Sequence, residues 1–74
     1  MSHWPSVTAR ETVAALKRAG FEAKRQRGSH LILFHAKTKR IVTVPMHKGD
    51  LPTGTIRSIV AQSGLDEEEF LRLL

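Results

Sequence analysis

Three short segments that each fit a β-strand follow one another in the middle of this chain, with connections too short to hold a helix: the first alternates weakly, the second is apolar and the third is β-branched. The segments are residues 21–26, 30–35 and 40–45. Gly28 allows a tight turn between the first two, and residues 36–39 form a polar connection to the third. Because strands joined by short connections pair antiparallel, we predict a three-stranded antiparallel meander that ends at Pro45.

Helix signals flank this meander on both sides. Thr8 and Glu11 have the spacing of a capping box, and Gly20 is suited to the left-handed position that ends a helix of about three turns. Beyond the meander, the apolar periodicity predicts a second helix from about Thr53, with Gly64 as its stop.

A third, shorter helix is predicted near the end of the sequence. Asp66 and Glu69 repeat the capping-box spacing, and Leu65 and Phe70 stand where a hydrophobic staple forms. The predicted fold class is therefore α+β with the order α-β-β-β-α. It has a three-stranded antiparallel sheet packed on two helices and a short extra C-terminal helix.

Length and the lack of cysteine restrict how such a fold is held together. The chain has 74 residues, and a domain of this size buries only about 60% of the surface exposed when it is unfolded, so its core is small. Without cysteine no disulfide is available, and apolar packing must supply the stability. We expect a single domain over residues 1–74, with residues 1–7 as an N-terminal arm.

Charge is distributed unevenly along the chain. Residues 1–49 hold ten Lys and Arg against two Glu, a balance of +8, whereas residues 50–74 have a balance of −3. A basic body suits a polyanionic partner, although such charge also serves ordinary solubility. The longest apolar run, Leu31–Phe34, is too short to span a bilayer, and no secretory signal pattern opens the sequence. We expect no membrane association and a cytoplasmic location.

The segment Arg25-Gln26-Arg27-Gly28-Ser29-His30 places cations, a turn glycine and an imidazole directly before the apolar strand. Imidazole is the side chain best suited to proton transfer near neutral pH, and the neighbouring cations suit a ligand that carries phosphate. From these residues alone, proton transfer by His30 and a structural role at the strand end are equally good interpretations.

The string RQRGSHLILFHAKTKRIVTVPMHKGDLPTGTIRSIVAQSG, preceded by a helix ending in KRAGF, resembles the HicA family of toxin mRNA interferases over about residues 8–70. The most diagnostic matches are Gly20-Phe21, Gly28-Ser29-His30, His35, Val44-Pro45, His47 and Leu51-Pro52-Thr53-Gly54-Thr55. The chain departs from the family pattern at Phe34, where a polar residue is commoner, and in the turn at 36–39. The resemblance implies a fold similar to a double-stranded RNA-binding domain, ribonuclease activity on mRNA, and silencing by a HicB-type antitoxin.

On this resemblance the catalytic residue is His30, which stands where the family has the histidine of its Gly-Ser-His motif. RNA carries its own nucleophile, the 2′-hydroxyl, so cleavage needs an acid or base and cations for the charge on the phosphorane, and we expect no cofactor and no metal. The residues expected to bind RNA are Lys24, Arg25, Arg27, Ser29 and Lys48. Next to glycine, however, Ser29 is more often a turn former. No DNA contact is expected for the toxin alone.

Two further histidines are candidates to assist His30. Because strand residues alternate between faces, His35 stands an odd number of positions from His30 and should project from the opposite face. His47 lies in a loop that could return over the sheet, which makes it the better candidate for an auxiliary acid or base. A zinc site built from these three histidines has weak support, because no acidic neighbour or short ligand spacing accompanies them.

Residues 31–34 are apolar on both faces of their strand, although a small sheet backed by helices should have a wetter outer face. The arm around Trp4, a partner such as the antitoxin, or core packing across a twisted sheet would each account for this. Two non-catalytic functions also remain open: a double-stranded RNA-binding module of the same fold, and a domain that only binds protein.

Overall fold

The computed structural model describes residues 4–74, so the first three residues of the predicted arm lie outside the described part. Its elements are α1 (Ala9–Arg18), β1 (Phe21–Arg27), β2 (His30–His35), β3 (Ile41–Pro45), α2 (Thr53–Ser63) and α3 (Glu67–Leu73). The predicted order α-β-β-β-α, followed by a short C-terminal helix, is confirmed. Within the described residues, no helix has the length and apolar character needed to cross a membrane.

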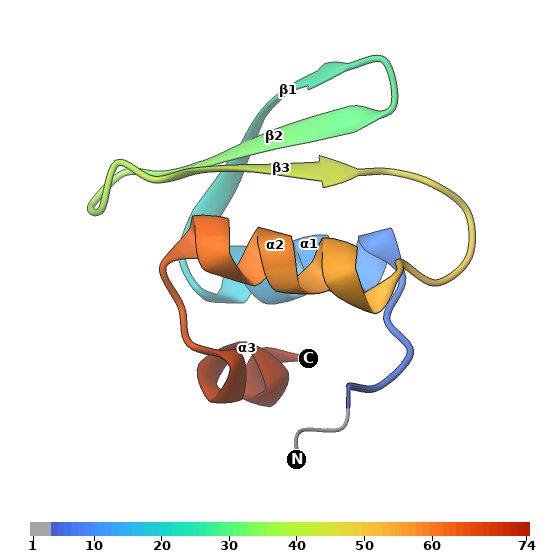
Figure 1. Ribbon diagram of the computed structural model, residues 1–74. Coiled ribbons are helices and arrows are strands. Elements are labelled where there is room, and N and C mark those ends of the chain that lie inside the picture. Colours follow the sequence, from blue (N-terminus) through green and yellow to red (C-terminus); the bar gives the residue numbers. More distant parts are fainter. Residues whose placement is uncertain (1–3) are drawn as a thin grey trace.

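The molecule is layered. Figure 1 shows the sheet on one side, α1 and α2 beneath it, and α3 on the far side; both α1 and α2 contact the sheet, and α3 contacts both of these helices. The core lies mainly between the sheet and the helices, because apolar side chains from both are fully buried there. The core continues to the far side of the helices, where Phe70 of α3 is fully buried, and its other largest members are Leu16, Leu33, Ile56, Ile59, Val7, Val42 and Val44.

Capping fixes where the first and last helices begin. The Thr8 hydroxyl accepts a hydrogen bond from the Glu11 amide (3.1 Å), and the Glu11 carboxylate accepts one from the Thr8 amide (2.9 Å). Asp66 and Glu69 make the same reciprocal pair at the start of α3. Both predicted capping boxes are therefore confirmed.

β2 is the central strand of the sheet, which has the order β1-β2-β3. The two-residue turn of Gly28 and Ser29 joins β1 to β2, and the positive φ of Gly28 (59°) is one that only glycine adopts readily. Two boundaries differ from the sequence prediction. β1 extends one residue further, to Arg27, and β3 begins at Ile41, because Lys39 adopts a left-handed conformation (φ 64°) that belongs to the preceding turn.

A β-bulge in β1 changes which face its later side chains occupy. The pairing with β2 shifts by one residue between Ala23 and Arg25, which leaves Lys24 as the extra residue. In a regular strand Arg25 and Arg27 would share the face of Ala23, which pairs with the buried Leu33. The bulge moves both arginines to the opposite face, away from the helices.

Candidate functional site

His30 is the first residue of the central strand, and its side chain is exposed. It pairs with Arg27 on β1 and with Pro45 on β3. Because directly opposed residues in an antiparallel sheet share a face, these three side chains form one row. Leu33 stands three positions along β2 and is fully buried against the helices, so the row of His30 lies on the other face.

Two further rows continue this surface along the sheet. Ile32 pairs with Arg25 and Thr43, and Phe34 pairs with Glu22 and Ile41. The extra residue of the bulge joins them, because the Lys24 ammonium lies 5.7 Å from the centre of the Phe34 ring. We call this surface the outer face; its residues are Glu22, Lys24, Arg25, Arg27, His30, Ile32, Phe34, Ile41, Thr43 and Pro45.

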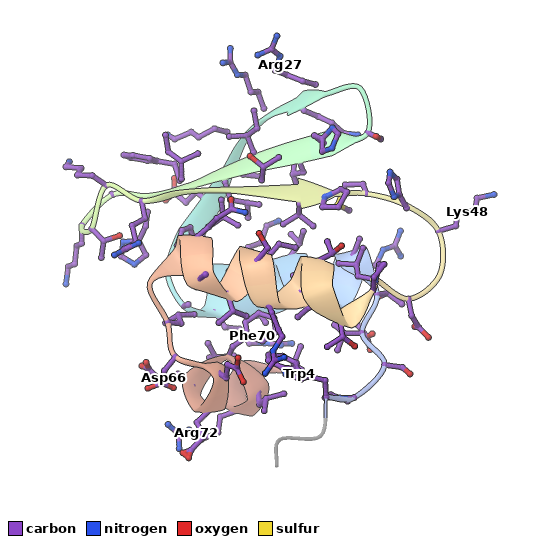
Figure 2. All side chains as sticks on the ribbon, viewed as in Figure 1. Trp4, Arg27, Lys48, Asp66, Phe70 and Arg72 are labelled. Carbon is purple, nitrogen blue, oxygen red and sulfur yellow. The ribbon has the colours of Figure 1, made fainter. Side chains whose placement is uncertain are left out.

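Positive charge dominates the β1 side of the outer face. Lys24, Arg25 and Arg27 are all exposed, and Glu22 is the acidic residue among the ten that form this surface. The salt bridge found within residues 4–74 joins α2 to α3 and involves none of these cations. Figure 2 shows Arg27 at the β1–β2 hairpin, at the end of the molecule opposite to α3. The bulge thus brings three sequence-predicted cations to the face that carries His30.

His35, at the other end of β2, lies on the helix side of the sheet. Its Nε2 donates to the carbonyl oxygen of Ala19 (3.1 Å), and its Nδ1 accepts from the amides of Lys37 (3.2 Å) and Thr38 (3.3 Å). Its ring also meets the Phe21 ring edge-on, with the ring centres 5.0 Å apart. Both ring nitrogens are therefore occupied, and His35 serves the packing of β2 on the end of α1.

The loop after β3 brings His47 and Lys48 to the same end of the sheet as His30. The Met46 amide donates to the carbonyl oxygen of Ser29 (2.6 Å), which fixes the start of the loop to the β1–β2 turn. Beyond this bond, the loop and the start of α1 border a shallow, open hollow of about 350 Å³. Its lining residues are Thr8, Ala9, Arg10, Met46, His47, Lys48 and Gly49. Figure 2 shows the Lys48 side chain pointing outward from this loop.

The family model described as HicA toxin of bacterial toxin-antitoxin matches residues 9–65, more than half of the chain. This chain belongs to the HicA toxin family. The match covers the whole sheet and both helices beneath it. Membership makes the chain a toxin of a toxin–antitoxin system, with an antitoxin as its kind of partner. None of the curated proteins that were compared matches it.

Two interpretations of the apolar outer face are wrong for this HicA protein. Trp4 does not cover that face, because its ring packs against the buried Phe70 of α3, with ring centres 6.3 Å apart. Figure 2 shows the two residues together on the far side of the helices. Core packing does not account for it either, because Ile32 and Phe34 project from the sheet away from the helices and are only half-buried.

The predicted histidines of this HicA protein do not come together as a group. His35 is held on the helix side, while His30 and His47 are exposed at the hairpin end. Across residues 4–74, no three or more His, Asp and Glu side chains are grouped so that they could hold a metal ion.

Arg10, which no sequence motif marks as a functional candidate, lines the hollow together with His47 and Lys48. In the sequence Arg10 is one of several cations on an ordinary helix. Its position two residues after the capping Thr8 is the signal that could have identified it as a candidate functional residue. That position turns its side chain toward the loop that follows β3.

Proposed function

We propose that this HicA protein is an endoribonuclease that cleaves mRNA in the cytoplasm, with His30 as general acid or base, and that a HicB-type antitoxin silences it. The observation that carries the proposal is the exposed row formed by His30 and Arg27, next to Arg25. A proton-transfer group beside two cations is what phosphodiester cleavage requires of a protein that supplies no nucleophile.

The chemistry follows from the nucleophile that RNA carries. The 2′-oxygen attacks the phosphorus while the bond to the 5′-oxygen breaks, which leaves a 2′,3′-cyclic phosphate and a 5′-hydroxyl. Neutral His30 accepts the proton of the 2′-hydroxyl, or protonated His30 gives one to the departing 5′-oxygen. Arg25 and Arg27 hold the phosphate oxygens through paired N–H donors and offset the charge of the phosphorane, with Lys24 as a third cation.

His47 is the proposed source of the second proton-transfer group. Its loop is tied to the β1–β2 turn by the bond from Met46 to Ser29, so it starts one residue from His30. Lys48, in the same loop, contacts a phosphate further along the strand. The Ser29 hydroxyl, exposed in the turn, offers a hydrogen bond to a phosphate oxygen.

The decisive experiment compares the wild-type chain with His30→Ala on labelled RNA, in the presence of EDTA. We expect cleavage by the wild type to persist in EDTA and the variant to be slower by about 10²- to 10⁴-fold, the usual contribution of a positioned acid or base. The products should carry 2′,3′-cyclic phosphate and 5′-hydroxyl ends. Because His30 is exposed, its removal should change the free energy of unfolding by no more than about 0.5 kcal/mol.

Toxicity gives the matching result in cells. Expression of the wild type should arrest growth, and expression of His30→Ala should not. Equal RNA decay with both proteins would remove His30 from the mechanism. A wild-type protein that binds double-stranded RNA but never cuts RNA would instead favour the non-catalytic binding module.

A further inference from the structure

Three apolar side chains lie together on the outer face, beside its cations. We call them the apolar patch: Ile32, Phe34 and Ile41. Phe34 and Ile41 are directly paired across β2 and β3, and Ile41 keeps 59% of its surface exposed. Apolar side chains on the solvent side of a sheet gain free energy when a ligand covers them.

We infer that single-stranded RNA lies across the outer face, with one base stacked on the Phe34 ring and the backbone following Lys24, Arg25 and Arg27. The inference rests on the proposed function for the identity of the ligand, and it adds a base-binding subsite at Phe34. Stacking on an aromatic ring combined with a cationic groove is the general way in which proteins hold single strands.

The spacing along β2 fits such a path. Phe34 is four residues beyond His30 on the same face, which is roughly 13 Å at the usual rise per strand residue. A strand with its scissile phosphate at His30 therefore brings a neighbouring base, and not the base at the cut, over the ring. Phe34 is for this reason a binding residue and takes no part in the proton transfer.

In the free protein, an exposed side chain that a ligand can displace lies over the face of the Phe34 ring. The Lys24 ammonium lies over the ring, 5.7 Å from the centre, at the end of a flexible four-carbon stem. When a base stacks on the ring, this stem allows the ammonium to swing to the adjacent phosphate. The ammonium that lies over the ring in the free protein then contacts the phosphate backbone of the RNA.

The chemistry of the face distinguishes a single strand from the other two occupants considered. A duplex keeps its base faces stacked inside, so it would leave the apolar patch without a partner. A protein partner could cover the patch. However, the patch is bordered by three cations and one acidic residue, Glu22, and this excess of positive charge complements a polyanion. An unpaired strand satisfies both the patch and the cations.

The test measures binding of a short mixed-sequence 2′-O-methyl RNA, which cannot be cut because its 2′-oxygen carries no proton. Phe34→Ala should weaken binding of the single strand by about ten-fold, equivalent to about 1.4 kcal/mol, whereas Phe34→Trp should keep or improve it. Binding of the matching duplex should change little in either variant. Leu74→Ala, which trims another exposed apolar residue (42% exposed) at the C-terminus, is the control and should bind as the wild type does.

Several outcomes would overturn the inference. The inference is wrong if Phe34→Ala binds the single strand as tightly as the wild type does, or if Phe34→Ala and Phe34→Trp lose the same affinity. It is also wrong if Phe34→Ala loses as much affinity for the duplex as for the single strand, or if the wild type does not bind the single strand. If Phe34→Ala binds RNA normally but escapes neutralisation by the antitoxin, the face is a protein interface. The probe cannot be cut, so this binding test is independent of the cleavage test. If His30→Ala cleaved RNA as the wild type does, the proposed function would be wrong, but the binding result at Phe34 would be unaffected.

Discussion

The two histidines of β2 stand on the same strand and yet on opposite faces of the sheet. The ring of His35 makes three hydrogen bonds and one edge-on contact, whereas within the described residues no hydrogen bond reaches the ring of His30. The side chains around them differ in the same way, because Leu33, Val42 and Val44 are fully buried and the cations near His30 are exposed. One face holds the molecule together, and the other is available to a ligand.

The largest expected effect of this division is a difference in stability between substitutions at neighbouring positions of β2. Leu33→Ala should lower the free energy of unfolding by about 2–5 kcal/mol, because it leaves a cavity under the centre of the sheet. Ile32→Ala removes a similar volume from the half-buried outer face and should cost about 1 kcal/mol. Urea denaturation of both variants measures the difference, and equal losses would mean that the two faces do not differ in stability.

A smaller effect is expected from His35→Ala. The loss of its hydrogen bonds and of its contact with Phe21 should lower the free energy of unfolding by about 1–3 kcal/mol. At a temperature where the variant is folded, its rate of RNA cleavage should remain close to the wild-type rate. His30→Ala is the matched control, with the opposite pattern of stable fold and lost cleavage. Loss of cleavage in a fully folded His35→Ala protein would contradict the comparison.

The smallest effect concerns single cations. Arg27→Ala should weaken RNA binding several-fold and reduce the slope of log affinity against log salt by about 0.7, the value for one phosphate contact on a single strand. Arg72→Ala is the control, because this arginine is also exposed but lies on α3, as Figure 2 shows. Affinity measured over a series of salt concentrations gives both slopes. If the two variants behaved alike, net charge and not the outer face would account for binding.

The sequence was sufficient to predict the elements, because their signals are local. Capping boxes at Thr8 and Asp66 and the stop at Gly64 depend on residues a few positions apart, and all three are present. Alternation along β2 likewise predicted that His35 faces away from His30. These features arise from backbone hydrogen bonding and side-chain parity, which do not need knowledge of the rest of the fold.

The makeup of the outer face could not be predicted in the same way. Counted from Phe21, simple alternation would place Arg25 and Arg27 toward the helices, and only the pairing with β2 shows that Lys24 is an extra residue. The position of His47 depends on long-range hydrogen bonds at both ends of its loop, from Met46 to Ser29 and from Leu51 to Val7. Both facts result from contacts between segments that are distant in sequence, and no local pattern records them.

The bulge at Lys24 divides β1 into two parts with separate tasks. Before it, Phe21 is the residue through which the strand joins the core; after it, the side chains of Arg25 to Arg27 are all exposed. Substitutions beyond the bulge therefore meet almost no packing constraint. We therefore expect substitutions at Arg25 or Arg27 to change the charge of the outer face with little effect on stability, whereas a substitution at Phe21 should destabilise the domain.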